Sequence, residues 1–156
     1  MTMEGTQNGD AEGVNRVLLE QQICFRVYVA SNLVTRLYRL HLDAMGLTYP
    51  QYLVMLILWE TELQSVSQLG DRLYLDSGKL TPLLKRLVAD GLAERETMES
   101  DRRAFRVRIS ERGAQLMREM TARHLEWINE LFAGVTEADA ARGISIMLDI
   151  RHKARR

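Results

Sequence analysis

SVSQLGDRLYLDSGKLTPLLKRLVADGLAERETMESDRRAFRVRIS, residues 65–110, is the stretch that decides the fold of this 156-residue chain. Its leucines recur at helical spacing before and after Asp76-Ser77-Gly78, which is a turn and cap signal. After Gly91 the period changes from 3.6 to 2, and residues 105–109 alternate as a half-buried strand does. Two short helices joined by a tight turn and followed by a charged hairpin predict a winged helix-turn-helix.

The segments on either side of this module are predicted to be helices. Residues 14–45 lack Gly and Pro and have apolar residues at helical spacing, and Gly46 is suited to end that helix. Thr48 and Pro50 are the signals expected at the start of the next helix, over 49–62. Residues 111–133 and 136–153 again have helical spacing. In the second helix of the module, Pro82 is expected near the first turn.

The long outer helices have apolar stripes that are broader than so small a module can cover, so we expect burial against a second copy of the chain. The predicted fold class is mainly α, a winged helix-turn-helix with a small β-hairpin wing flanked by long dimerisation helices. We expect one entwined domain with three parts: a disordered leader (1–13), a winged helix-turn-helix (49–110) and a helical dimerisation region (14–48 and 111–156).

The net charge of zero conceals a local imbalance. The chain has 21 Lys and Arg against 21 Asp and Glu. Within residues 77–110, however, eight basic side chains stand against five acidic ones. Phosphate binding depends on local basic groups, so the neutral total does not exclude DNA.

Composition excludes several other classes of protein. The longest apolar run, residues 52–59, is far shorter than the roughly 20 residues of a membrane span, and no export signal is visible. We therefore expect a reduced, cytoplasmic setting and no membrane partner. The single cysteine excludes an intramolecular disulfide, and His41, His124 and His152 have no ligand spacing, so we expect neither a metal nor a cofactor.

Residues 80–110 resemble the recognition helix and wing of the MarR family of transcriptional regulators. Asp101-x-Arg103 followed by Val107-x-Ile109-Ser110 is similar to that family's wing signature. Residues 18–60 and 66–87 further resemble the branch that senses organic hydroperoxides, the OhrR-type repressors, through an early-helix Cys, a Tyr fourteen residues later and the block GLTYPQYLVMLILWE.

The resemblance implies a redox-sensing role for Cys24, Tyr38 and Tyr49. From the residues alone, a lone Cys on an apolar stripe is more often a buried small hydrophobe, and both tyrosines could simply pack at an interface. Tyr38 lies roughly 21 Å along the helix from Cys24, so the two can meet only if a second copy supplies the tyrosine. Some members of the branch have a second cysteine that resolves the oxidised one, and this chain has none.

The resemblance also implies DNA contacts. The N-terminal residues of the recognition helix approach base edges, and the hairpin tip enters the minor groove, with Asp101 orienting Arg103. The expected DNA-binding residues are Asp76, Ser77, Lys79, Thr81, Arg86, Arg95, Asp101, Arg102 and Arg103.

The function implied is a homodimeric repressor, not an enzyme, that binds a pseudo-palindromic operator and releases it when organic hydroperoxide oxidises Cys24. A low-molecular-weight thiol is a further expected partner. Three alternatives stay open: a MarR-type regulator that binds a phenolic ligand with Cys24 a bystander, a one-cysteine peroxidase, and a dimerisation protein that does not bind DNA.

Overall fold

Two capping boxes set the starts of the first two helices of the module. In the computed structural model, which describes residues 18–98 and 101–154, Thr48 caps α3 (Tyr49–Glu60) and Ser65 caps α4 (Val66–Leu73). Each hydroxyl accepts from the backbone N–H three residues later, and the Gln side chain there accepts from the cap N–H at 2.8 Å. These reciprocal bonds satisfy backbone donors that a helix start otherwise leaves open.

The recognition helix α5 (Ser77–Ala89) follows a tight turn. Tyr74 ends α4 in the left-handed region at φ 58°, and the Leu75 N–H donates to the Gly70 carbonyl. Asp76 caps α5 by accepting from the Lys79 N–H at 2.9 Å, so the helix starts at Ser77. The expectation for Pro82 was wrong: it lies in the second turn, where it removes the hydrogen bond to the Gly78 carbonyl.

The wing is an antiparallel sheet in the order β1-β3-β2. Strand β2 (Ala93–Met98) pairs along β3 (Asp101–Ile109), with an irregularity in register between Thr97 and Met98. Strand β1 (Gln64–Ser65) pairs with Val107 and Arg106 of β3. The sequence analysis did not predict β1, because two residues are too few to show a period of 2.

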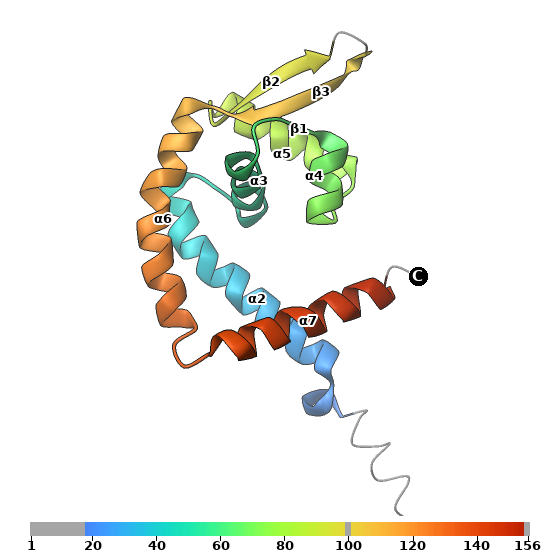
Figure 1. Cartoon of the computed structure of the whole chain (residues 1–156), viewed down its shortest axis with the longest axis vertical. Coiled ribbons are helices and arrows are strands. Elements are labelled where there is room, and N and C mark those ends of the chain that lie inside the picture. Colours follow the sequence, from blue (N-terminus) through green and yellow to red (C-terminus); the bar gives the residue numbers. More distant parts are fainter. Residues whose placement is uncertain (1–17, 99–100, 155–156) are drawn as a thin grey trace, which may run out of the picture.

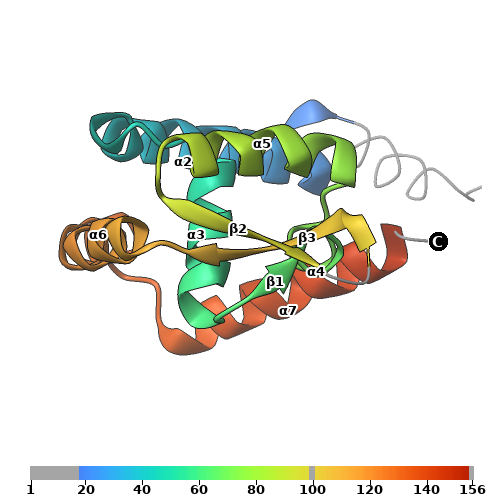
Figure 2. The same ribbon diagram turned by 90° about the horizontal axis from the view of Figure 1, so that it is seen from above.

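Three long helices surround this module (Figure 1). They are α2 (Ile23–Leu42), α6 (Glu111–Leu131) and α7 (Glu137–Ala154), with two short 3-10 helices, η1 (Leu19–Gln21) and η2 (Asp43–Met45), at the ends of α2. Viewed from above, α2 and α7 lie on opposite sides of the chain (Figure 2). Gly46 ends η2 at φ 67°, as expected of a C-terminal cap.

The expected single helix over 14–45 is wrong in detail. Gln22 is extended between η1 and α2, so the regular helix begins only at Ile23. The expected disordered leader falls on residues outside those that the structure describes.

The core lies mainly inside the module, and Leu42 of α2 and Met117 and Met120 of α6 extend it to two of the outer helices. Side chains of α3, α4, α5 and β3 make up most of its fully buried members, which are Val54, Met55, Leu58, Leu69, Leu80, Leu84, Leu87 and Val107. Each such side chain contributes roughly 1.5–3 kcal/mol when it leaves water. No residue of α7, by contrast, is buried.

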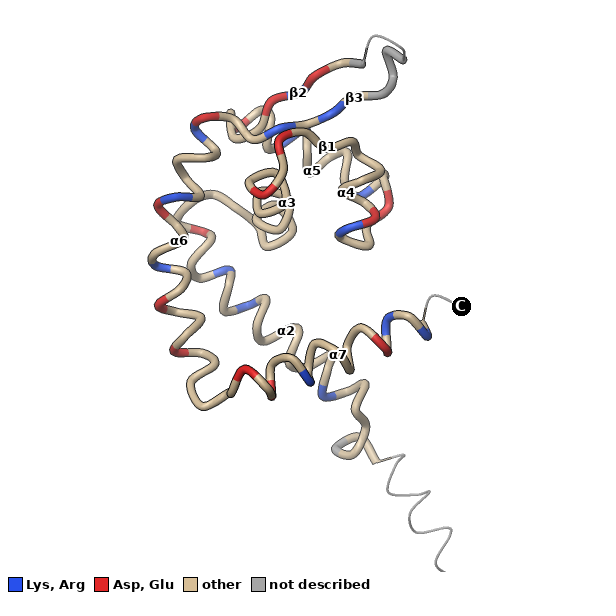
Figure 3. The backbone as a smooth tube through the Cα atoms, in the orientation of Figure 1, with Lys and Arg blue, Asp and Glu red and all other residues tan. Residues whose placement is uncertain are grey.

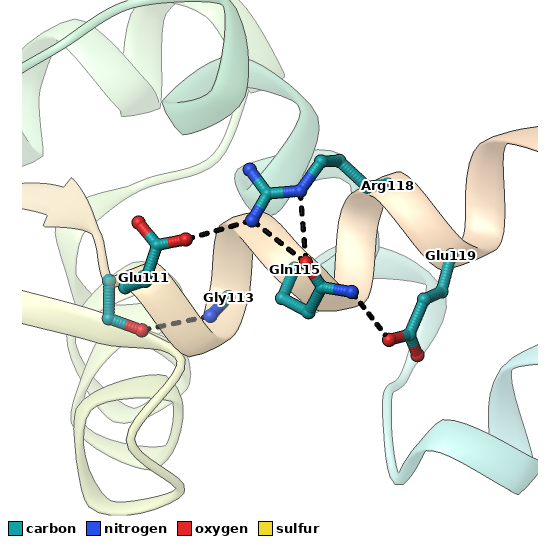
Figure 4. Close-up of polar contacts among 6 residues, drawn as sticks. Glu111, Gly113, Gln115, Arg118 and Glu119 are labelled. Carbon is teal, nitrogen blue, oxygen red and sulfur yellow. Dashed lines mark hydrogen bonds and ion pairs between the residues drawn. The ribbon is translucent and has the colours of Figure 1, made fainter.

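The start of α6 fastens the wing to the recognition helix. Ser110 is buried; its hydroxyl donates to the Gly91 carbonyl at 2.7 Å and accepts from the Gly113 N–H at 2.9 Å. On the exposed face, Arg118 binds Glu111 and Gln115, and Gln115 donates to Glu119 (Figure 4). No helix among the described residues is long and apolar enough to cross a membrane.

Candidate DNA-binding surface and cysteine site

The N-terminus of the recognition helix is exposed. Asp76, Ser77 and Lys79 all lie at the surface, and Thr81 is half-buried. The Lys79 ammonium is 3.7 Å from the Asp76 carboxylate, and both side chains are largely exposed. A surface ion pair of this kind contributes little, so the ammonium can exchange its carboxylate partner for a phosphate.

Arg86 lies near the other end of α5. Its Nε donates to the Asp90 carboxylate at 3.0 Å, and it lines a cavity together with Met45 and Arg112. The sequence placed Arg86 with the DNA-binding residues, and the structure places it far along the helix from Lys79. Contact with DNA would require Arg86 to exchange Asp90 for a phosphate.

The wing has acidic positions along β2 and basic positions along β3 (Figure 3). Arg108 binds Glu94 across the two strands at 2.8 Å. The Arg95 guanidinium stacks over the Phe105 ring, 4.1 Å from its centroid, which fixes the direction of that cation at the base of the wing. The three expected contacts Asp101, Arg102 and Arg103 belong to β3, but their side chains lie outside the part of the chain that the structure describes.

Cys24 lies in the first turn of α2 and is exposed as a free thiol. The general expectation for a lone cysteine on an apolar stripe, burial in a core, does not hold within this chain. Tyr38 is fourteen residues further along the same straight helix, so about 21 Å separates the two along the axis. The structure therefore does not bring Cys24 to either expected tyrosine within one copy.

Tyr38 and Tyr49 do come together. Their ring centroids lie 4.6 Å apart, and the Trp127 ring contacts Tyr38 edge-on at 4.7 Å. Tyr38 retains 9% of its exposure, and burial, with smaller contributions from Tyr52 and Tyr49, raises its pKa to about 12. Burial likewise raises the pKa of Tyr49. At neutral pH these phenols are hydrogen-bond donors.

Tyr52 and two histidines, to which the sequence analysis gave no role, complete this cluster. The Nε2 of His124, on α6, lies 3.2 Å from the Tyr52 hydroxyl and 3.5 Å from the Tyr38 hydroxyl. Burial lowers the pKa of His124, and the nearby His41 lowers it further. His41 itself packs on the Trp127 ring at 4.6 Å.

The sequence did contain a signal for His124. It continues the inward stripe of α6 that includes Met120 and Trp127, so it faces the interior and needs a polar partner there. Among the described residues, no three potential ligands lie close enough to hold a metal.

The fold and the exposed N-terminus of α5 define a winged helix-turn-helix protein of the DNA-binding kind. The model of the MarR family matches residues 47–105, and the chain belongs to the MarR family.

Named relatives support this membership. The organic hydroperoxide resistance transcriptional regulator of Bacillus subtilis is 47% identical over 63% of this chain and 67% of its own length. The structure of reduced AbfR bound to DNA has a TM-score of 0.72 at 32% identity, over 95% of this chain and 98% of that one. A disulfide-formed AbfR is similar at a TM-score of 0.65 and 32% identity, over 96% and 100%.

Proposed function

We propose that this chain is a DNA-binding transcriptional repressor that senses organic hydroperoxides by oxidation of Cys24 and then releases its operator. The observation that carries the proposal is the pairing of Tyr38 with Tyr49, two phenolic donors at a place that Cys24 of the same chain cannot reach. The relative from Bacillus subtilis is named for organic hydroperoxide resistance, which supports the same function.

The working form in this proposal is a homodimer. Helix α7 has no buried residue although it contains Ile144, Met147 and Leu148, and α2 exposes Ile23, Tyr28 and Leu33. Apolar faces of this extent are covered in solution, and a second copy brings the same faces in self-complementary form. Such a copy would place its own Cys24 beside Tyr38 and Tyr49.

The sensing step needs a thiolate. Phenolic hydroxyls that donate to sulfur favour the charged form of Cys24. The thiolate sulfur attacks the outer peroxide oxygen, the O–O bond breaks, and this oxygen stays on sulfur with its proton as a sulfenic acid. The alkoxide leaves and takes a proton from water to become an alcohol, and the hydroxide formed takes the sulfenic acid proton, which leaves a sulfenate. Sulfur is oxidised by two electrons to a sulfenate, and the hydroperoxide is reduced by two.

The sulfenate has no second cysteine in the chain to react with. Its protonated form therefore condenses with a low-molecular-weight thiol to a mixed disulfide and water, condenses with a backbone nitrogen to a sulfenamide and water, or is oxidised further by a second hydroperoxide. The reaction is stoichiometric, so the protein acts as a sensor and not as a peroxidase. Reversal requires the reducing thiols of a cytoplasmic compartment.

On DNA, the dimer presents two recognition helices to half-sites of a pseudo-palindromic operator, about one helical turn apart. Asp76, Ser77 and Lys79 face base edges at the start of α5, and Arg103 enters the minor groove from the wing. Oxidation of Cys24 at the dimer interface moves the helices that hold the two modules and breaks this spacing.

An operator-binding titration tests the proposal. DNA selected from a random pool by the reduced protein is titrated with wild type and Cys24→Ser, with and without one equivalent of tert-butyl hydroperoxide. We expect at least a tenfold loss of affinity for wild type after oxidation and no change for Cys24→Ser.

Two results would contradict the proposal. A Cys24→Ser protein that still leaves DNA on peroxide treatment would favour the regulator with a phenolic ligand. Multiple turnovers of peroxide with a thiol reductant, together with no release of DNA on oxidation, would favour the peroxidase.

A further inference from the structure

Three helices meet at His124. Tyr38 comes from α2, Tyr52 from α3 and His124 from α6, and the two phenolic oxygens both lie within hydrogen-bond reach of the same ring nitrogen. Tyr52 is 4% exposed and Tyr38 is 9% exposed, so water competes little for these contacts.

A neutral imidazole cannot serve both phenols equally. Its Nε2 has either one lone pair or one hydrogen in the ring plane, and each makes one good hydrogen bond. Tyr52 is the nearer partner, at 3.2 Å against 3.5 Å for Tyr38. One phenol is therefore bound to His124, and the other keeps its hydroxyl proton for a different acceptor.

We infer that His124 is a positioning residue of the peroxide sensor: its Nε2 accepts a hydrogen bond from the Tyr52 hydroxyl and so leaves the Tyr38 hydroxyl to donate to the Cys24 thiolate of a second copy. The inference rests on the proposed function. It assigns His124 and Tyr52 a part in setting the reactivity of a thiol that neither contacts in the same chain.

The surroundings of His124 keep it neutral, as an acceptor must be. The titratable groups that face it are His41 and Tyr38 from α2 and Tyr52 from α3, and Glu119 and Arg123 of α6 line the same cavity. Burial and His41 lower its pKa. Among the described residues no carboxylate contacts the ring, so no ion pair there holds the imidazolium.

This arrangement has a consequence that a packing role would not produce. If Tyr52 loses its hydroxyl, Nε2 of His124 accepts a hydrogen bond from the Tyr38 hydroxyl instead. That hydroxyl then no longer donates to Cys24. If His124 is also replaced by an apolar ring, no acceptor competes with the Cys24 thiolate, and the Tyr38 hydroxyl again donates to it. The double variant should therefore react faster than the single Tyr52→Phe variant.

The experiment compares full-length wild type with Tyr38→Phe, Tyr52→Phe, His124→Phe and the Tyr52→Phe/His124→Phe double variant, all of which keep aromatic rings in place. The readouts are the pH midpoint of Cys24 alkylation by iodoacetamide and the rate of Cys24 oxidation by tert-butyl hydroperoxide at pH 7. We expect Tyr52→Phe to raise the midpoint by about 0.5 pH unit and slow oxidation about threefold. The double variant should return to within about twofold of wild type.

The outcomes separate the inference from the function on which it rests. Slow oxidation by Tyr38→Phe together with a double variant as slow as Tyr52→Phe would overturn the role of His124 and leave the sensor intact. Unchanged oxidation by Tyr38→Phe would overturn the inference and the role of Tyr38, and the operator titration with Cys24→Ser would still test the sensor by itself.

A measurement on the wild type alone covers the case in which a variant does not fold. The ¹⁵N shifts of His124 in the reduced protein should show a neutral ring with the proton on Nδ1 and an accepting Nε2. A proton on Nε2 would overturn the inference, because the ring would then donate to the phenols and compete for no proton.

Discussion

The Tyr52 hydroxyl lies 3.2 Å from the Nε2 of His124, and this contact joins α3 of the DNA-binding module to α6 of the outer region. Tyr38 of α2 lies 3.5 Å from the same nitrogen. Helix α2, which carries Cys24, therefore approaches α3 and α6 at the His124 ring. These two helices hold the recognition helix and the wing in place. A displacement of Tyr38 or Tyr52 would therefore act directly on the helices that support the DNA-binding surface.

Raising the pH should destabilise the protein between about pH 10 and 12. The pKa values of Tyr38 and Tyr52 are raised from 10.0 to about 12, mainly by burial. Below pH 10 both the folded and unfolded chains keep these protons, so the stabilisation is fully present. Above pH 10 the unfolded chain ionises first, and the stabilisation is lost by the time the pH passes 12. Urea midpoints measured from pH 9 to 12 should fall more steeply for wild type than for Tyr52→Phe, and equal slopes would contradict the assignment.

Removing the Ser110 hydroxyl should cost more than removing an ordinary cap. Ser110→Ala loses the cap of α6 and leaves the Gly91 carbonyl without its donor, so we expect a loss of about 2 kcal/mol in the free energy of unfolding. The matched control is Ser65→Ala, because the hydrogen bonds of this exposed cap join Ser65 only to Gln68 within one capping box. We expect a loss of about 1 kcal/mol for this variant. Denaturant unfolding measures both, and similar losses would show that the bond to Gly91 contributes nothing.

Gly113→Ala should destabilise the protein although alanine is the better helix former. A Cβ at this position would overlap the Leu92 carbonyl and lie 3.0 Å from the Met55 methyl, where α6 crosses the base of the wing. Overpacking of this kind costs typically 1–3 kcal/mol. Glu126→Ala, an exposed change in the same helix, should stay within about 0.5 kcal/mol. Thermal unfolding compares the two, and a Gly113→Ala protein as stable as wild type would show that this contact relaxes freely.

Lys79→Ala and Arg103→Ala should each weaken operator binding by at least about 1 kcal/mol, because the proposed function assigns a DNA contact to Lys79 at the start of α5 and to Arg103 in the wing. Fluorescence anisotropy at several salt concentrations would measure the loss, and a phosphate contact would also lower the salt slope by about 1. Arg118→Ala is the control, since that guanidinium is bound to Glu111 on α6. Unchanged affinity for either variant would refute the role of that residue.

Ile144→Asp should dissociate the proposed dimer. The Ile144 side chain is 62% exposed on α7 within one copy, and a buried carboxylate at an apolar interface is unfavourable. Sedimentation at micromolar concentration should show a smaller particle, and operator binding should fall with it. Glu137→Ala, a polar change at the start of the same helix, should leave the mass unchanged. A variant that keeps the mass of a dimer would exclude α7 from the interface.

Sequence reasoning reached the module because its signals are local. Thr48 and Ser65 cap helices within three residues of themselves, and the change of period after Gly91 marks the wing. The same reasoning missed β1, which exists only because β3 lies beside it, and it misplaced Pro82, whose position depends on where Asp76 starts the helix. The resemblance pointed to Cys24, Tyr38 and Tyr49, whereas no local pattern connected His124 to them.

The sequence by itself determined the order of the long helices and the hairpin, the local excess of basic charge and the absence of a second cysteine. These depend on neighbouring residues or on composition alone. Only the tertiary structure decided that Tyr38 and Tyr52 share one nitrogen of His124, across separations of 86 and 72 residues. Helix packing sets which side chains meet at such separations along the chain. Which of the two phenols then binds His124 depends on a difference of a few tenths of an ångström in the oxygen–nitrogen distance.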